Sequence, residues 1–169
     1  LLGIVDDLVR RPPGATLVDG HRLVLLGPPD VSLSGSLWGA TRDARGGVLA
    51  PLALGLHQRV VDLVRDLVVS GRVDGVHDVS AGGLGVAIAE MVSRSGVGAH
   101  LARVDDHRAL FGEGPSRVVL VVDPECLSDV LAAAEAAAVP TTRIGLATGD
   151  RLIVKGLLDV SVDDVVAAH

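Results

Sequence analysis

Val118-Val119-Leu120-Val121-Val122 is the strongest strand pattern in this chain of 169 residues. Five consecutive apolar residues with no charge among them are typical of a strand that is buried inside a sheet. The turn Asp123-Pro124 follows, and residues 127–137 then have the composition of a helix. This strand–turn–helix unit predicts the α/β (α+β) class, in which helices pack on a β-sheet.

Similar patterns extend from this unit toward the start of the chain. Residues 21–27 predict a second buried strand, and residues 56–69 predict a helix whose apolar side chains share one face. Residues 75–78 predict a brief strand or turn. A glycine loop at residues 80–83 then opens onto a helix over residues 84–93, so this stretch predicts a loop at a helix N-terminus.

Toward the other end of the chain, two strand patterns flank a turn. Residues 142–147 and 151–155 are separated by Thr148-Gly149-Asp150, whose glycine favours a β-hairpin. Ser161 is followed by two aspartates, a pattern typical of an N-cap with acidic residues in the first turn. A last helix is therefore expected over residues 162–168.

One domain accounts for most of the chain, because this length can bury a single substantial core. Pro12 and Pro13 end any helix near the start. We therefore expect residues 1–19 to be a connector from a missing N-terminal domain and residues 20–169 to be the domain itself.

The composition excludes several classes of function. With 15 basic and 21 acidic residues the net charge is −6, which argues against a surface for DNA or RNA. The apolar runs are far shorter than the roughly 18–20 residues that cross a bilayer, so no membrane partner is expected. The single cysteine, Cys126, can form neither an internal disulfide nor a thiolate metal cage, which indicates a cytoplasmic setting.

The first candidate site is His77-Asp78-Val79-Ser80-Ala81-Gly82-Gly83-Leu84. Gly82 and Gly83 allow the backbone to approach a ligand, and their amides at a helix N-terminus favour an anion such as a phosphate. An alternative stays open, in which Asp78 and Ser80 cap the helix and the glycines only form its turn. His77 is likewise either a phosphate donor or general base, or a hydrogen-bonded structural residue.

The second candidate site is Glu113-Gly114-Pro115-Ser116-Arg117, directly before the most apolar strand. A guanidinium is well suited to bidentate recognition of a phosphate or carboxylate. Because charged groups are rarely buried without partners, Glu113 and Arg117 either pair with each other or serve a ligand. Neither site is assigned a catalytic residue, and the scattered histidines have no metal-ligand spacing, so no metal site is predicted. The predicted site residues, as candidates for binding a substrate or nucleotide phosphate, are His77, Asp78, Ser80, Gly82, Gly83, Glu113, Ser116 and Arg117.

The order of the motifs carries a resemblance to a known family. The residues that carry it include Ser34-Gly35-Ser36-Leu37-Trp38, the stretch from His77 to Leu84, Leu110-Phe111-Gly112-Glu113, Ser116-Arg117 and Thr142-Arg143-Ile144-Gly145. They resemble the C-terminal domain of the aminoimidazole ribonucleotide synthase-related proteins, and within that superfamily the last domain of phosphoribosylformylglycinamidine synthase of the PurL type. The fold that this resemblance implies is a mixed β-sheet flanked by helices.

The resemblance also implies a function, the ATP-dependent amidation of formylglycinamide ribonucleotide in purine biosynthesis. The complete enzyme would use ATP and Mg²⁺, and a glutamine amidotransferase partner would supply ammonia. The remaining domains of the parent synthase would be the other partners, so this chain alone is expected to be inactive. The alternatives are a structural or assembly domain, or a related ATP-dependent enzyme: aminoimidazole ribonucleotide synthase, thiamine-monophosphate kinase, selenophosphate synthetase or a hydrogenase-maturation protein.

Overall fold

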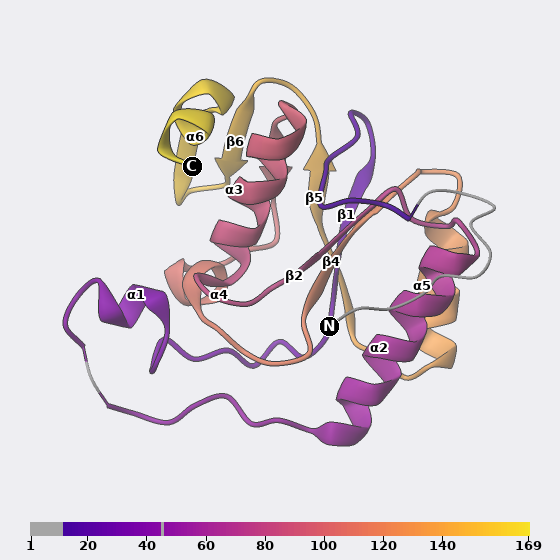
Figure 1. Cartoon of the computed structure of the whole chain (residues 1–169), viewed down its shortest axis with the longest axis horizontal. Helices are drawn as coiled ribbons and strands as arrows, with labels where there is room; N and C mark the ends of the chain where they lie inside the picture. The colour runs from indigo at the N-terminus through magenta and orange to yellow at the C-terminus, as the bar shows by residue number, and fades with distance from the viewer. Residues whose placement is uncertain (1–11, 45) are drawn as a thin grey trace.

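The computed structural model describes residues 12–44 and 46–169, and in these residues a seven-stranded mixed sheet lies between two groups of helices (Figure 1). The strand order is β2-β4-β1-β5-β3-β6-β7. Neighbouring strands are antiparallel except β3 and β6, which are parallel. The expected fold class is thereby confirmed. The strands are β1 (Arg22–Leu26), β2 (Gly75–Asp78), β3 (Ala99–Leu101), β4 (Val118–Val122), β5 (Thr141–Ala147), β6 (Arg151–Val154) and β7 (Leu158–Ser161).

The helices cover both faces of the sheet. Helices α2 and α5 contribute to one apolar cluster with β1 and β4, and helix α3, with residues of α4 and α6, contributes to a second cluster on the opposite face. In Figure 1 these two groups stand on either side of the strands. The helices are α1 (Leu37–Ala40), α2 (Leu54–Val69), α3 (Gly83–Ser95), α4 (His107–Phe111), α5 (Leu127–Ala136) and α6 (Val162–Ala168).

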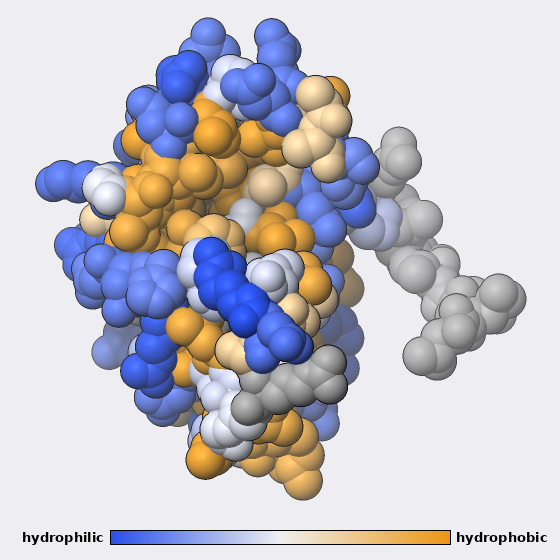
Figure 2. Space-filling model, turned by 90° about the vertical axis from the view of Figure 1, so that its left-hand side faces the viewer, coloured by the Kyte–Doolittle hydropathy of each residue, from blue (hydrophilic) through white to orange (hydrophobic). Residues whose placement is uncertain are grey.

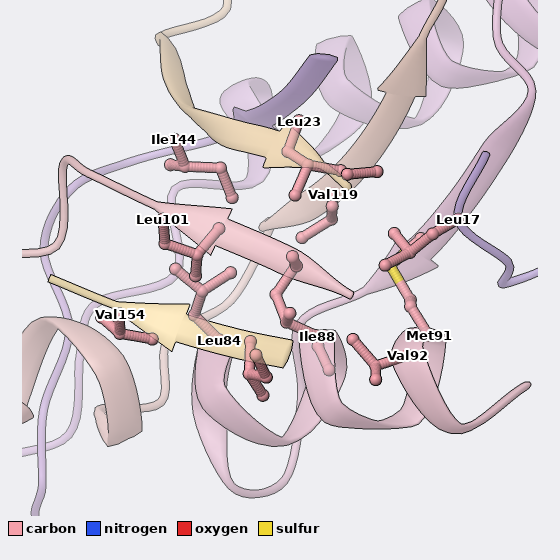
Figure 3. Packing of buried hydrophobic residues seen from close by; sticks show 14 of the residues in the cluster. Leu17, Leu23, Leu84, Ile88, Met91, Val92, Leu101, Val119, Ile144 and Val154 are labelled. Atoms are coloured by element: carbon pink, nitrogen blue, oxygen red, sulfur yellow. The ribbon is translucent and has the colours of Figure 1, made fainter. Parts of the chain in front are cut away.

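Strand β4 connects the two cores, as its uninterrupted apolar sequence requires. Side chains alternate along a strand, so Val119 and Val121 face the α3 side while Leu120 and Val122 face α2 and α5, and all four are fully buried. Full burial of such a side chain contributes about 1.5–3 kcal/mol. Figure 3 shows the α3 side, where the labelled side chains of the helix, such as Ile88, point toward the strands.

The predicted β-hairpin is wrong. Strands β5 and β6 form where the sequence indicates, but they do not pair with each other, because β3 lies between them. Ala99 pairs with Ala147 of β5 on one side and with Leu152 of β6 on the other. Only three residues long, β3 has too short a pattern to be recognised in the sequence.

The other predicted elements match the structure within a few residues, and Ser161 does cap the last helix by accepting a hydrogen bond from the Asp164 amide at 3.0 Å. The sequence reading missed α1, α4, β3 and β7. No helix in the described ranges combines the length and the apolar character that a membrane crossing needs.

Part of the expected connector packs against the domain. Leu17 is buried in the core on the α3 side, and the Val76 amide donates to the Gly14 carbonyl at 3.1 Å. Residues 1–11 of the connector lie outside the described residues. The boundary near residue 20 therefore stays a prediction.

Candidate functional site

Five of the eight predicted site residues line one open pocket with a volume of about 890 Å³. The structure brings the end of β2 beside the loop before β4, because these strands are antiparallel neighbours with Asp78 opposite Val118. Helix α2, Leu49, Ala50 and Leu52 form another part of the wall, together with Ser34 and Gly35. The predicted residues in the pocket are Asp78, Ser80, Glu113, Ser116 and Arg117, whereas His77, Gly82 and Gly83 do not line it.

Arg117 is a buried cation in this pocket. The residue is only 5% exposed, and its side-chain Nε has no hydrogen-bond partner within the described chain. Its Nη1 lies 3.5 Å from the Gly112 carbonyl, a long contact, and no described carboxylate forms an ion pair with it. Burial lowers the pKa of Arg117, although a guanidinium stays protonated at neutral pH. The pocket therefore holds a positive charge that lacks a counterion among the residues that the structure describes.

Glu113 has a different role from Arg117. Its Oε1 accepts a hydrogen bond from the Leu37 amide at 2.7 Å and from the Gly82 amide at 2.8 Å. The carboxylate thus connects the start of α1 to the loop that leads into α3. Hydrogen bonds to an ionised acceptor are among the stronger ones, so this connection holds one edge of the pocket in place. The internal Glu113–Arg117 ion pair, one of the alternatives left open by the sequence, does not form.

The two glycines are required by the backbone. Gly82 and Gly83 have φ of +81° and +68°, and an added Cβ would lie 2.2 Å from Val86 Cγ2 and 2.7 Å from the Gly112 carbonyl, respectively. Their amides have internal partners, Glu113 Oε1 and the Ser80 carbonyl. Gly82 itself is the N-cap of α3 and no side chain caps this helix, so the alternative of an Asp78 or Ser80 cap is wrong. Binding of an external anion by these amides stays a prediction.

His77 lies outside the pocket and connects β2 to α3. Its Nδ1 is 2.7 Å from the Asp78 carbonyl oxygen and its Nε2 is 2.8 Å from Oε2 of Glu90. A carbonyl oxygen can only accept, so Nδ1 must carry a proton, and Nε2 then faces a carboxylate. The ring thus has two internal partners, which is the structural alternative left open by the sequence.

His57 is a pocket residue that the sequence reading missed. It lies in the first turn of α2, and its Nδ1 is 3.0 Å from the Ser116 hydroxyl oxygen. The two residues are 59 positions apart, so no local pattern connects them. Ser116 has a φ of +63°, in the left-handed region, which is uncommon for a residue with a side chain. His57, Ser116 and Arg117 together offer polar groups to an anion.

The described residues contain no group of three or more His, Cys, Asp or Glu side chains that could hold a metal ion. Leu49, Ala50, Leu52 and three valines of α2 form an apolar part of the wall, and α2 also contributes Arg65. An open pocket with a buried cation and an apolar wall can accept a ligand that has an anionic group and an apolar or planar part.

The fold and the pocket define an α/β domain with helices on both faces of a mixed sheet and a site suited to an anionic ligand. The chain belongs to the family described as "AIR synthase related protein, C-terminal domain", whose family model matches residues 18–156.

Curated relatives of the chain are subunits of one enzyme. The chain is 36% identical over 167 residues to "Phosphoribosylformylglycinamidine synthase subunit PurL" of Nocardioides sp., and 37% identical over 172 residues to the PurL subunit of Methylocella silvestris. Both matches cover 98% of this chain but only 22% and 23% of the relatives. The chain thus spans less than a quarter of the length of the curated relatives that it matches.

Solved structures share the fold. The structure of T. maritima PurL complexed with FGAR matches with a TM-score of 0.76 at 18% identity, over 92% of this chain and 29% of that chain. Hydrogenase maturation protein HypE matches with a TM-score of 0.57 at 15% identity, over 89% of this chain and 50% of that chain. At such identities the likeness shows the fold alone.

Proposed function

We propose that the chain is the C-terminal domain of a phosphoribosylformylglycinamidine synthase PurL subunit. The activity of the complete enzyme is then the ATP-dependent amidation of formylglycinamide ribonucleotide in the cytoplasm. This proposal is supported by the PurL relatives, which align with 98% of the chain. Solved T. maritima PurL structures named as complexes with FGAR, ATP and ADP fit the same proposal.

The guanidinium of Arg117, which forms no ion pair with a described carboxylate, is the observation that best supports a ligand-binding role for this domain. A buried cation without a counterion is destabilising, and an anionic ligand would offset that cost. The substrate and the nucleotide both carry phosphates, which a guanidinium binds well. We therefore assign Arg117 to binding an anionic group, with Ser116 and His57 beside it. Glu113 holds the loops that form the pocket and takes no part in the chemistry.

Asp78 and Ser80 lie on the β2 side of the same pocket. The carboxylate of Asp78 would repel a phosphate, so we assign it to the hydroxyl-bearing part of a ligand. Gly82 and Gly83 shape the loop behind these residues. The described residues offer no set of ligands that fits Mg²⁺, and we place ATP-bound Mg²⁺ with the other domains of the synthase.

Under this proposal the chain does not act alone. Its partners are the remaining domains of the synthase, together with a glutamine amidotransferase that supplies ammonia. The complex named "Structure of PurLQS from Thermotoga maritima" is consistent with an assembly of several subunits. The superfamily resemblance includes an internal duplication, and the pocket belongs either to the catalytic cleft or to its vestigial counterpart.

A structural or assembly role is the second candidate function. Glu113 and His77 favour it, because their polar atoms are used in connections between elements. This role predicts that changes at Arg117 lower stability and leave the activity per folded molecule unchanged. The ligand-binding role predicts the opposite.

The experiment uses a chimeric synthase, in which this chain replaces the matching segment of the Nocardioides PurL subunit. ADP release is measured with ATP, Mg²⁺ and ammonia, with and without formylglycinamide ribonucleotide. The proposal predicts release that depends on this substrate. There are two control substrates. One is formylglycinamidine ribonucleotide, the precursor of aminoimidazole ribonucleotide, and the other is thiamine monophosphate. ADP release that depends on one of these instead would move the chain to another branch of the superfamily.

A further inference from the structure

The face of the sheet that α2 and α5 cover is packed over only part of its width. The apolar cluster on this side takes its strand residues from β1, β2 and β4, and none of its members comes from β5, β3, β6 or β7. Along β3, Ala99 and Leu101 belong to the core on the α3 side, so His100 between them points to the α2/α5 side, where it is exposed. We call this uncovered part the open sheet face.

Three arginines gather where the open sheet face meets β1. Side chains alternate along a strand, so Arg22 points to the same side as Val24, which belongs to the α2/α5 cluster. Arg143 of β5 is opposite Val24 in the strand register, and its side chain therefore points the same way. The segment after β3 is hydrogen-bonded to β5 and brings Arg103 beside them. Arg22, Arg103 and Arg143, which we call the arginine trio, line one hollow of about 250 Å³.

The arginine trio has no internal partner in the described chain. None of its guanidinium groups forms an ion pair or a hydrogen bond with a described residue, and all three residues are exposed. Arg151 of β6, by contrast, is paired, since its Nε donates to Asp159 Oδ1 at 2.6 Å. The net charge of the chain is −6, so the trio is a local positive surface on an acidic molecule.

The opposite side of the sheet has a different character. There α3, α4 and α6 contribute to a core that includes residues of β3, β5 and β6. Figure 2, which views the molecule from the side of α1 and α6, shows apolar surface gathered among polar residues. The hollow of the arginine trio instead presents three guanidinium groups, so a partner that fits it is anionic.

The exposure and the width of the arginine trio favour a segment with several negative groups over a single small anion. Each exposed guanidinium binds one anion weakly, because water and salt screen the pair. The trio extends from β1 across β5 to the end of β3, which is about 10 Å at about 4.8 Å per strand. That distance is larger than one carboxylate or phosphate group. An acidic segment can place several carboxylates along it, and the weak pairs then act together.

We infer that the arginine trio is a docking site for an acidic, carboxylate-rich segment of a partner protein. This inference goes beyond the proposed function, because none of the three arginines lines the pocket of Arg117. A second copy of this chain is a poorer occupant, since two molecules with a net charge of −6 each repel one another.

Fluorescence anisotropy tests the inference with a labelled octa-aspartate peptide and the 169-residue chain at low salt. The unmodified chain should bind the peptide. The triple variant Arg22→Gln, Arg103→Gln and Arg143→Gln should bind it at least about tenfold more weakly, since three exposed ion pairs are lost together. Thermal unfolding followed by circular dichroism verifies that the variant is folded.

A matched control separates the site from the overall charge of the chain. The triple variant Arg59→Gln, Arg72→Gln and Arg94→Gln removes the same charge from three exposed arginines that do not line the hollow. Because these arginines lie outside the docking site, the control should change the Kd by less than about twofold.

Equal weakening in the two triple variants would overturn the inference, because binding would then follow the net charge alone. Failure of the unmodified chain to bind the peptide would overturn it as well. Displacement of the peptide by pyrophosphate, beyond what sodium chloride of the same ionic strength causes, would contradict it by making the trio a site for small anions. Self-association that the first triple variant abolishes, measured by sedimentation velocity, would assign the surface to a second copy instead. The proposed function is judged separately, by substrate-dependent ADP release.

Discussion

At the scale of the single residue, the properties of Arg117 distinguish a ligand-binding site from a structural loop. Its guanidinium is desolvated, and its lowered pKa means that the folded state holds the proton less tightly than the unfolded state does. At every pH below the folded-state pKa, the buried charge therefore costs stability. That cost is present at neutral pH and falls only as the pH rises through the folded-state value.

Arg117→Met should therefore leave the melting temperature of the isolated chain unchanged or raise it, with a gain in unfolding free energy of about 1 kcal/mol. Differential scanning fluorimetry across a pyrophosphate series should show a rise in melting temperature for the unmodified chain and none for this variant. Arg143→Met, at an exposed arginine outside the pocket, should retain the rise. A rise of equal size in the Arg117 variant would remove this residue from the anion site.

Glu113→Ala should lower the free energy of unfolding by about 1.5–3 kcal/mol, because two amides lose a charged acceptor. Glu113→Gln should lose less, since its amide oxygen can still accept both hydrogen bonds. Urea denaturation followed by circular dichroism measures the difference. If the two variants prove equally stable, the connection through Oε1 contributes nothing.

Glu113 and Arg117 also show where sequence reasoning ends at this scale. Both stand out before a buried strand, and the sequence predicted them as a pair or as ligand contacts. The partners of Glu113 are 76 and 31 positions away, so the local pattern could not separate its connecting role from the role of Arg117. His57 was not predicted as a site residue for the same reason, because only the fold brings it close to Ser116.

The loop before α3 is the element that sets the β2 side of the pocket. The sequence located this loop and its glycines correctly, since a glycine pair before a helix is a strong local signal. It did not reveal that Gly82 is itself the N-cap and that its amide is used by Glu113. The predicted hairpin failed for a different reason, because the insertion of β3 between β5 and β6 is a long-range pairing.

Gly82→Ala should destabilise the chain by clearly more than Gly96→Ala does. Both glycines have positive φ, +81° and +68°, so both variants lose about 1 kcal/mol through backbone strain. Only at Gly82 does the added Cβ meet Val86, at 2.2 Å, whereas nothing lies within 4 Å at Gly96. Thermal unfolding of the two variants isolates the cost of that contact. Equal losses would mean that the α3 loop has room to shift.

At the scale of the whole molecule, the apolar pattern of β4 was enough to predict a sheet with helices packed on it. The strand is buried on both faces, and its alternating side chains belong to two separate cores. Strand order and the pocket were beyond the pattern, since they depend on contacts between distant segments. The family resemblance supplied the mixed sheet, and the match over residues 18–156 agrees with it.

The central claim is that this domain binds an anionic group of the substrate through Arg117. The most direct measurement is kcat/KM for formylglycinamide ribonucleotide in the chimeric synthase, with and without Arg117→Met, at equal melting temperature. The account predicts a fall of at least about tenfold, which corresponds to about 1.4 kcal/mol of lost transition-state stabilisation. An unchanged kcat/KM in a folded variant would contradict it and leave the domain a structural role.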